Sequence, residues 1–276
     1  MCELLGMNCN VPTDICFSFS GFRRRGGATD VHSDGWGIGF FEGKGVRLFL
    51  DPEPSAHSPV AELVRSYPIH SLNVIAHIRK ATQGRVALEN THPFGRELWG
   101  RQWLFAHNGN LPQFQPRLDG SPTPVGDTDS ERIFCWLLQQ LRQRFGANAP
   151  PASRLFDALR ELTLAFAGQG ISNYLLSNGG VLIAHCSTRL SYLVRAAPFG
   201  EAHLSDEDVT VDFSQLTTPN DRVAVIATLP LTDNEPWVEM QPGSLWMFAD
   251  GAVIAQCDTL PAPPALPAEL ARPSGA

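Results

Sequence analysis

The chain has no excess of positive charge. Its 276 residues carry 21 Lys and Arg against 28 Asp and Glu, which gives a formal net charge of −7. Nucleic-acid surfaces need clustered cations, so this balance argues against a nucleic-acid partner. The short basic run Arg23-Arg24-Arg25 is expected to be solvated surface rather than a phosphate site.

Paired cysteines, long apolar runs and phosphate loops are also missing. None of the six cysteines stands in a C-x-x-C pair, which disfavours zinc and thioredoxin-type sites. There is no signal-peptide pattern and no apolar run of about 18 residues, as a membrane span would need. No G-x-x-x-x-G-K-[ST] loop is present. A cytoplasmic protein with reduced thiols and no membrane contact is the default expectation.

The pattern that is present predicts an α+β fold. With 43% hydrophobic and 18% charged residues, the chain can bury a sizeable core. Strands come first, a helical pair follows, and strands return, which suits two mostly antiparallel sheets covered by helices. A single domain over residues 2–260 is expected, followed by a Pro-rich tail, residues 261–276, that is not expected to pack.

Periodicity and turn signals place the elements. Strands are expected over residues 2–8, 37–41, 46–50, 72–78, 103–106, 171–177, 181–186, 192–195, 209–212, 222–228, 243–249 and 253–257. Helices are expected from Thr13-Asp14 to Phe22, from Ser58-Pro59 to about Tyr67, from Thr128 through Leu141, and from Ser153 to about Ala167. Thr128 and Glu131 fit a capping box.

The first residues hold a candidate nucleophile. If Met1 is removed, Cys2 carries both a thiol and a free α-amine. An α-amine has a reference pKa of about 7.7–8, so it can take the thiol's proton near neutral pH. The alternative interpretation is a small apolar residue at the start of a strand.

Three further motifs supply candidate binding groups. Arg79 follows a strand and could bind a carboxylate, or form a surface salt bridge. Asn108 and Gly109 could donate two hydrogen bonds to an oxyanion, or form an ordinary Asn-Gly turn. Asp129 lies at a helix start, where it could bind an ammonium group or stabilise the helix dipole. Combined, these groups suit an amino acid whose side chain ends in an amide.

The motifs together resemble the class II (type 2) glutamine amidotransferases, which are N-terminal nucleophile (Ntn) hydrolases, and the stand-alone YafJ-like subgroup in particular. The resemblance covers about residues 2–135 in order and spacing, and the later strands are compatible with it. It rests on Met1-Cys2-Glu3-Leu4-Leu5-Gly6-Met7, Asp34-Gly35-Trp36-Gly37-Ile38, His77-Ile78-Arg79, Glu89-Asn90-Thr91-His92-Pro93-Phe94, Ala106-His107-Asn108-Gly109 and Asp127-Thr128-Asp129-Ser130-Glu131.

The resemblance implies a four-layer αββα sandwich and a set of roles. Cys2 would be the nucleophile with its own amine as base, and Asn108 and Gly109 the oxyanion hole. Arg79 would bind the α-carboxylate of glutamine and Asp129 its α-ammonium. The loop at residues 79–94 would close over glutamine. Within it, Thr82 would contact the substrate and His92 would organise the loop. Lys80 departs from the family pattern, because relatives carry an aromatic residue after the arginine.

The implied reaction is hydrolysis of the glutamine side-chain amide through a Cys2 thioester, with no metal or organic cofactor. A separate synthase that accepts the ammonia is one expected partner, since no second domain fits after residue 260. The alternative is a hydrolase of γ-glutamyl amides in small peptides or thiol metabolites. A third hypothesis is a catalytically silent regulatory subunit, which the complete set of motif residues disfavours.

Overall fold

The computed structural model of the chain describes residues 2–81 and 84–259, so the predicted tail and Thr82 lie outside the described residues. This part of the chain contains four α-helices: α1 (Cys16–Arg24), α2 (Pro59–Ser66), α3 (Asp129–Phe145) and α4 (Ala152–Leu164). Its strands are β1 (Glu3–Thr13), β2 (Trp36–Glu42), β3 (Gly45–Asp51), β4 (Ser71–Ile78), β5 (Phe94–Leu98), β6 (Arg101–Asn110), β7 (Ile171–Ser177), β8 (Leu182–Cys186), β9 (Ser191–Ala196), β10 (Glu201–His203), β11 (Thr210–Asp212), β12 (Arg222–Ala227), β13 (Val238–Glu239), β14 (Ser244–Ala249) and β15 (Ala252–Asp258).

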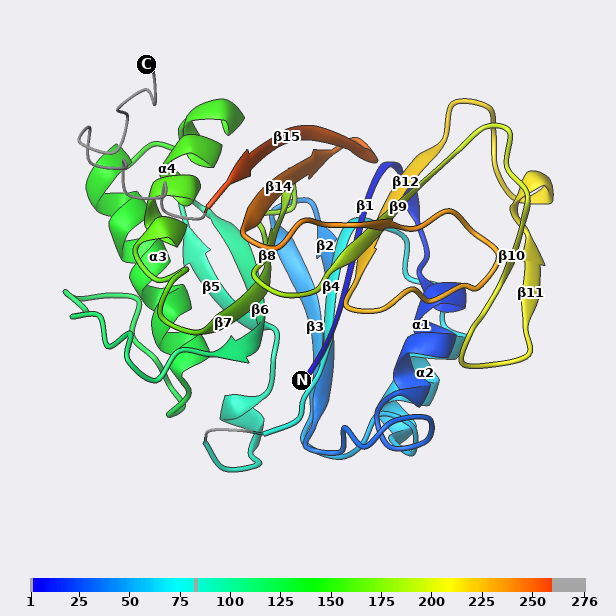
Figure 1. Ribbon diagram of the computed structural model, residues 1–276, viewed down its shortest axis with the longest axis horizontal. Helices are drawn as coiled ribbons and strands as arrows, with labels where there is room; N and C mark the ends of the chain where they lie inside the picture. The colour runs from blue at the N-terminus through cyan, green and yellow to red at the C-terminus, as the bar shows by residue number, and fades with distance from the viewer. Residues whose placement is uncertain (1, 82–83, 260–276) are drawn as a thin grey trace, which may run out of the picture.

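Two antiparallel sheets lie between two pairs of helices (Figure 1). The seven-stranded sheet has the order β13-β9-β12-β1-β4-β2-β3, and the six-stranded sheet has the order β15-β14-β8-β7-β6-β5. Helices α1 and α2 cover the outer face of the first sheet, and α3 and α4 cover the second. The predicted four-layer αββα architecture is therefore confirmed.

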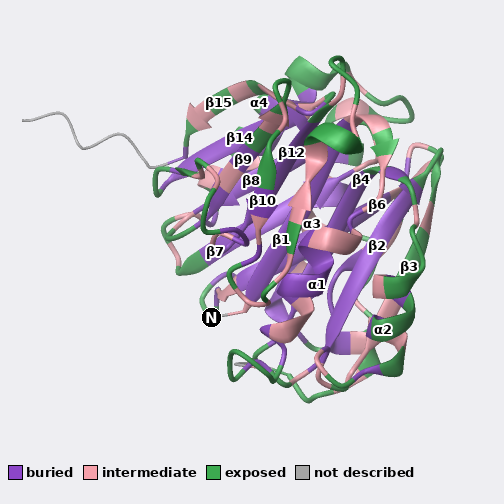
Figure 2. Cartoon of the chain, turned by 90° about the vertical axis from the view of Figure 1, so that its right-hand side faces the viewer, coloured by how far each residue is buried: buried purple, intermediate pink, exposed green. Residues whose placement is uncertain are grey.

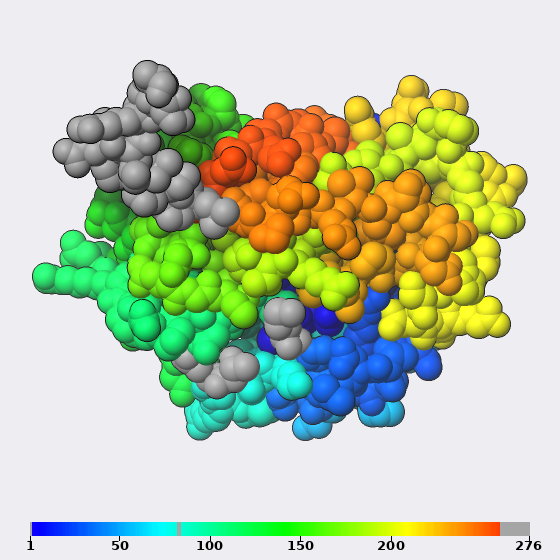
Figure 3. Space-filling model, viewed as in Figure 1, coloured from blue at the N-terminus to red at the C-terminus, as the bar shows by residue number. Residues whose placement is uncertain are grey.

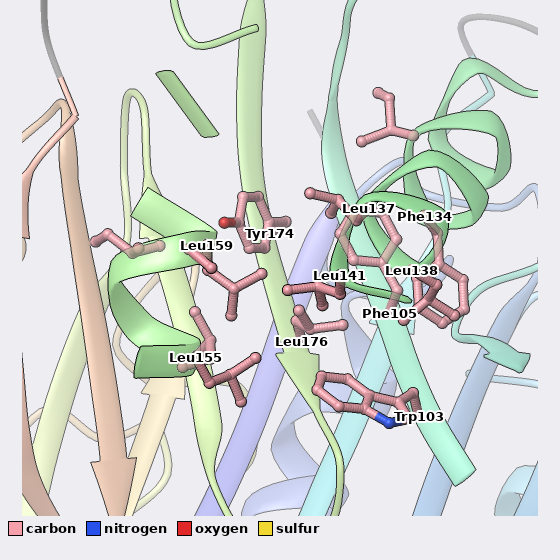
Figure 4. Packing of buried hydrophobic residues seen from close by; sticks show 14 of the residues in the cluster. Trp103, Phe105, Phe134, Leu137, Leu138, Leu141, Leu155, Leu159, Tyr174 and Leu176 are labelled. Atoms are coloured by element: carbon pink, nitrogen blue, oxygen red, sulfur yellow. The ribbon is translucent and has the colours of Figure 1, made fainter. Parts of the chain in front are cut away.

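Three apolar clusters fill the spaces between these layers. In one, α3 and α4 pack on the six-stranded sheet (Figure 4). The side chains that meet there include Phe134, Leu137, Leu138 and Leu141 from α3, Leu155 and Leu159 from α4, and Phe105, Tyr174 and Leu176 from the sheet. A second cluster lies beneath α1 and α2, and a third lies between the sheets. Figure 2 shows buried residues along the strands and exposed residues mostly in loops and on outer helix faces.

Strand β1 is the central strand of its sheet, and both of its faces are buried. Leu5 and Met7 contact the helix-side cluster, whereas Leu4 contacts the cluster between the sheets. This explains why the stretch Leu4-Leu5-Gly6-Met7 within β1 is apolar at successive positions rather than at alternate ones. A Cβ on Gly6 would lie 3.0 Å from Leu182 and 3.1 Å from Leu175, so glycine lets the two sheets approach closely here.

The sequence predicted most elements with small shifts at their ends. Ser58 caps α2 by accepting the N–H of Ala61 at 3.2 Å, as expected. The first strand, however, is longer than predicted, because β1 continues to Thr13 and α1 begins only at Cys16. Asp14 still serves this helix, since its Oδ1 accepts the N–H of Cys16 at 3.0 Å.

The expectation that the basic run is solvated is wrong for Arg25, whose side chain is buried. Its Nη1 donates to Glu3 Oε2 at 2.9 Å, and its Nε donates to Asp206 Oδ2 at 2.8 Å. It also donates to the carbonyl oxygens of Leu229 and Pro230. Arg25 therefore joins the start of β1 to the segment that follows β10.

None of the helices in the described part of the chain is long and apolar enough to cross a bilayer.

Candidate active site

Cys2 lies immediately before β1, where β12 and β4 flank the strand. Its Sγ rests against the peptide groups of Lys80, with the backbone N–H nitrogen at 3.2 Å and the carbonyl oxygen at 3.3 Å. Burial raises the pKa of the Cys2 thiol, and the Lys80 backbone and the charge of Arg79 offset this only in part. The thiol is therefore protonated near neutral pH and needs a base before it can attack.

Asn108 holds the backbone of Cys2 through two hydrogen bonds. Its Oδ1 accepts the N–H of Cys2 at 3.0 Å, and its Nδ2 donates to the carbonyl oxygen of Cys2. The strand before Asn108 was predicted to end at Ala106, and this boundary is wrong because β6 continues to Asn110 and pairs with β7. Polar residues fit inside this strand because they find partners, and Asn173 Nδ2 donates to the carbonyl oxygen of Asn108 at 3.2 Å.

Gly109 and Cys2 line one small cavity, which we name the Cys2 cavity. A Cβ on Gly109 would lie 1.9 Å from the carbonyl oxygen of Ile171 and 2.5 Å from Nε2 of His107. Contacts this close are impossible for a real side chain, so glycine is required by the pairing of β6 with β7. The backbone of Gly109 is thereby left open to a molecule in the cavity.

Arg79 follows β4 directly, as predicted. Its backbone N–H donates to Gly35 O at 2.8 Å, and its own carbonyl oxygen accepts the N–H of Asp34 at 3.1 Å. Its guanidinium donates to the carbonyl oxygens of Arg85 at 3.1 Å and Gly84 at 3.3 Å. Arg79 is thus a buried cation at the edge of the Cys2 cavity that also contacts the loop following it.

Asp129 is the first residue of α3, and it lines the same cavity. Its Oδ1 accepts the N–H of Ser130 at 2.8 Å, and its Oδ2 accepts the N–H of Leu111 at 2.8 Å. Oδ1 also accepts the Ser130 hydroxyl at 3.3 Å, whereas Oδ2 keeps an acceptor position at which the carboxylate can receive an ammonium group. Thr128, rather than Asp129, caps the helix by accepting the N–H of Glu131 at 3.2 Å.

The predicted capping box is only half formed. Thr128 caps the helix as expected, but the carboxylate of Glu131 does not return to Thr128. Instead it accepts the N–H groups of Val125 at 3.1 Å and Gly126 at 2.7 Å, and it pairs with Arg96. Glu131 is buried, and it forms an ion pair with Arg96 because an unpaired buried carboxylate would cost on the order of several kcal/mol of stability. It thereby holds the loop that enters α3.

Three buried histidines, His77, His92 and His107, form part of the cavity lining. His92 Nδ1 accepts the backbone N–H of His107 at 3.1 Å, and its ring packs on His77 with centroids 4.3 Å apart. Burial lowers the pKa of His92 well below its usual range and lowers the pKa of His77 to about 3. Both rings are therefore neutral. His107 Nδ1 lies 2.8 Å from the Ser130 hydroxyl, which itself contacts Asp129.

The structure brings Cys2, Arg79, His92, Gly109 and Asp129 to the lining of one cavity, with Asn108 bonded to Cys2 beside it. Within residues 2–81 and 84–259, no group of three or more His, Cys, Asp or Glu side chains is placed to hold a metal ion.

Sequence reasoning missed residues that support this arrangement. His107 and Ser130 stood inside the motifs without an assigned role, and their contact links α3 to β6. Asn173 was not singled out at all, although it is fully buried and pairs with Asn108 in the sheet register. An amide residue in the interior of a predicted strand was the available signal, since such a residue needs partners when buried.

Comparisons with known proteins agree with this geometry. The family model for class-II glutamine amidotransferases matches residues 1–269. A candidate glutamine amidotransferase of Escherichia coli (strain K12), YafJ, is 55% identical over 251 residues, which cover 91% of this chain and 98% of the relative.

Two solved structures share the fold of this chain. The crystal structure of a predicted glutamine amidotransferase from Pseudomonas aeruginosa has a TM-score of 0.74 at 48% identity and covers 92% of this chain and 99% of that chain. The glutamine phosphoribosylpyrophosphate amidotransferase of Bacillus subtilis shares the fold with a TM-score of 0.56 at 15% identity, covering 94% of this chain and 49% of that chain. The chain therefore belongs to the class-II glutamine amidotransferase family and has the Ntn fold of its amidotransferase domains.

Proposed function

We propose that the chain, once Met1 is removed, hydrolyses the side-chain amide of L-glutamine to glutamate and ammonia through a γ-glutamyl thioester on Cys2. The observation that carries this proposal is the pair of hydrogen bonds between Asn108 and Cys2, beside a cavity lined by Arg79 and Asp129. These groups match the parts of glutamine: an amide carbon to attack, a carboxylate and an ammonium.

In the first step the α-amine of Cys2 accepts the thiol proton, and Sγ forms a bond to the amide carbon. Asn108 Oδ1 supports this role because it already accepts a hydrogen bond from the Cys2 nitrogen. One N–H of the Asn108 amide is donated to the Cys2 carbonyl oxygen, which leaves the second N–H for the oxyanion. We assign the other oxyanion contact to the backbone N–H of Gly109.

In the second step the C–N bond breaks, and the leaving nitrogen takes a proton from the Cys2 ammonium and departs as ammonia. A water molecule then attacks the thioester carbon, the C–S bond breaks, and the thiol is restored with glutamate as the product. Arg79 would bind the α-carboxylate bidentately and Asp129 the α-ammonium. His92 would organise the loop at residues 79–94, and Thr82 would contact the substrate. The ammonia would either be used by a separate synthase or be released as a product of hydrolysis.

The test compares two preparations released from a cleavable N-terminal fusion, one that begins at Cys2 and one that begins at Met1. Intact mass identifies each, and glutamate release is measured with glutamine. The Cys2 preparation should turn over, and the Met1 preparation should be nearly inactive because its nitrogen is an amide without basicity. Cys2→Ala should abolish turnover, by at least about 1,000-fold, with an unchanged unfolding curve. Substantial activity of either the Cys2→Ala variant or the Met1 preparation would contradict the proposal.

The alternative substrate class is a γ-glutamyl amide with a larger amine. The same contacts to the γ-glutamyl portion would serve both reactions, so the two differ only in the space offered to the leaving group.

A further inference from the structure

A second cavity lies beside the start of α1, on the outer face of the seven-stranded sheet. It has a volume of about 280 Å³, and we name it the α1 cavity. Met7, Val223 and Val225 of β1 and β12 form its floor, and all three belong to the apolar cluster beneath α1 and α2. Its walls come from the end of β1, the start of α1 and the segment around β11. They include the apolar residues Val11, Ile15, Phe17, Val211 and Phe213.

The segment 199–217, which carries β10 and β11, closes one side of the α1 cavity. The rings of Phe17 in α1 and Phe213 in this segment meet edge to face, with centroids 5.5 Å apart. The Ser20 hydroxyl of α1 donates to Glu207 Oε2 at 2.6 Å. In Figure 3 the yellow residues of this segment lie against the blue residues around α1, at the right of the molecule. The cavity is therefore enclosed between packed parts of the chain.

Aromatic side chains make the α1 cavity suitable for a flat apolar group. Phe17, Phe199 and Phe213 line it and are each half-buried, so their rings keep surface that a ligand can cover. An apolar cavity of roughly 150 Å³ holds benzene. The larger volume of about 280 Å³ gives room for a two-ring aromatic group with a short chain. Covering the three rings would remove apolar surface from water, which favours binding.

The lining of the α1 cavity carries unbalanced negative charge. Its charged and titratable members are Asp14, Asp221, Arg195 and His70. Arg195 is already neutralised, because its Nε donates to Glu235 Oε1 at 2.7 Å and its Nη2 donates to Glu235 Oε2 at 2.6 Å. The ion pairs formed by the described residues include neither Asp14 nor Asp221. Two carboxylates without a cation partner therefore line an otherwise largely apolar space.

Hydrogen bonds to the backbone hold both carboxylates in place. Asp14 Oδ1 accepts the N–H of Cys16 at 3.0 Å. Asp221 Oδ2 accepts the N–H of Thr218 at 3.0 Å, and its Oδ1 accepts the Thr218 hydroxyl at 2.6 Å. The hydrogen bonds from Thr218 lower the pKa of the Asp221 carboxyl below its usual range, which favours its charged form. Fixed carboxylates and phenyl rings both attract a cation, the rings through their electron-rich faces.

We propose that the α1 cavity is a second binding site of this chain, and that it takes an organic cation with an aromatic group and an amine, such as an arylalkylamine. The aromatic group would lie among Phe17, Phe199 and Phe213, and the ammonium group would pair with Asp14 or Asp221. Among the described residues, none that lines this cavity also lines the Cys2 cavity. The inference is therefore independent of the proposed amide hydrolysis, and either can fail without the other.

The first experiment measures the Kd of three indole probes for the wild-type chain by isothermal titration calorimetry. Tryptamine carries an ammonium group, tryptophol carries a neutral hydroxyl group in its place, and indole-3-propionate carries a carboxylate. The titrations are made in low salt at pH 8, above the range in which histidines usually titrate. Charge complementarity should make the Kd of tryptamine about tenfold lower than that of tryptophol, with indole-3-propionate weakest. Equal Kd values for tryptamine and tryptophol, or no binding of tryptamine at millimolar concentration, would overturn the inference.

The second experiment removes the charges singly and together. Asp14→Asn and Asp221→Asn keep an acceptor oxygen for the backbone N–H, and each should raise the Kd of tryptamine by about threefold. The Kd of tryptophol should stay the same. Asp157→Asn is the matched control, since Asp157 is an exposed carboxylate on α4 and does not line the cavity. An unchanged Kd of tryptamine in the Asp14→Asn, Asp221→Asn double variant would contradict the role of the two carboxylates.

The third experiment tests where the probe binds. Val211→Trp puts a large side chain into the α1 cavity and should abolish binding of tryptamine and tryptophol, with thermal unfolding as the check on the fold. Undiminished binding by the folded variant would overturn the inference. Saturating glutamine should leave the Kd of tryptamine unchanged, and competition would place the probe in the Cys2 cavity instead. The wild-type comparison of probes needs no variant to fold.

The outcomes also separate this inference from the proposed function. Cys2→Ala should bind tryptamine as the wild-type chain does, although it should no longer hydrolyse glutamine. If the wild-type chain hydrolyses glutamine but does not prefer the cationic probe, only the role of the α1 cavity fails. If it prefers the cationic probe but does not hydrolyse glutamine, only the proposed function fails.

Discussion

Asn108 and Cys2 are bonded to each other twice, in opposite directions: Cys2 donates its N–H to Asn108 Oδ1, and Asn108 Nδ2 donates to the Cys2 carbonyl oxygen. One side chain thereby fixes both ends of the same residue's backbone. Any rotation of Cys2 about its backbone must break at least one of the two bonds, so the thiol has a defined orientation relative to β6.

Asn108→Asp should separate the two functions of this side chain. A carboxylate can still accept from the Cys2 nitrogen, but it cannot donate to an oxyanion and it adds negative charge. We expect kcat for glutamine to fall by about 100- to 1,000-fold, as for other oxyanion-hole donors. Steady-state kinetics measure this, with Asn148→Asp on the exposed α3–α4 connection as control. Retention of more than a tenth of wild-type kcat would refute the assignment of Asn108.

Gly109→Ala should damage the sheet as well as the site. The added methyl group would meet the backbone of Ile171, which cannot move without separating β6 from β7. Overpacking of this kind typically costs about 1–3 kcal/mol of unfolding free energy. Urea unfolding should show the loss. At Gly45 an added Cβ has only an ordinary contact at 3.7 Å, so Gly45→Ala is the control. If Gly109→Ala and Gly45→Ala have equal unfolding free energies, β6 and β7 can move apart to accept a methyl group at little cost.

Arg25→Met should leave Glu3 as an unpaired buried charge. Breaking a buried ion pair from one side costs about 3–5 kcal/mol of unfolding free energy. Adding Glu3→Gln should recover part of that loss, because the stranded charge is removed. Denaturant unfolding of both single variants and the double variant measures this coupling. Additive losses would mean that Arg25 acts mainly through Asp206 and the carbonyl groups of Leu229 and Pro230.

The same pair predicts a pH dependence. Burial raises the pKa of Glu3 above its usual range, while Arg25 works against this. A raised pKa means that the folded state binds the proton more tightly, so stability is greatest below the unfolded pKa and is lost as pH rises. In Arg25→Met that loss should be larger. The variant should be closest to wild-type stability near pH 4.5 and fall further behind toward pH 7. A constant gap across this range would argue that Glu3 is not the group responsible.

His185→Gln should reduce the acid sensitivity of the fold. Burial lowers the pKa of His185 to about 4, and both ring nitrogens already have partners in Ser172 and Thr259. Because the folded state resists protonation, stability is complete above pH 6.5 and is lost as pH falls toward 4, by on the order of 3 kcal/mol. Unfolding curves between pH 7 and 4 should be flatter in this variant. His57→Gln changes an exposed histidine and serves as the control, so its unfolding free energy should change with pH as in the wild type. If His185→Gln shows the same pH dependence as the wild type, His185 is not the group responsible.

Local elements could be predicted because their causes lie within a few residues. The hairpin of β2 and β3 follows from the turn at Glu42-Gly43-Lys44-Gly45, where Gly43 has a φ of 61°. The start of α3 follows from Thr128. The ends of β1 and β6 were misjudged because polar residues there are paired across the sheet, and those pairings involve residues far away in the sequence.

The site was predictable in its members but not in its supports. Cys2, Arg79, Gly109 and Asp129 were expected to meet and do line one cavity, although their roles stay predictions. Arg25 and Asp206, by contrast, are 181 residues apart, and Asn173 and Asn108 are 65 apart. No local pattern specifies such contacts, because a buried arginine or amide takes whichever partners the packed chain brings within reach.

The attachment of the turn between β8 and β9 through Asn173 has a consequence for how this scaffold can diversify. Asn173 in β7 accepts the backbone N–H groups of residues 187–189, and the hydroxyl groups of Ser187 and Thr188 accept hydrogen bonds from β7 in return. The turn is therefore held to β7 by its backbone and by two of its side chains. A segment exchanged between Cys186 and Ser191 should keep the backbone path of this turn only if Asn173 stays and if hydroxyl groups are kept at positions 187 and 188.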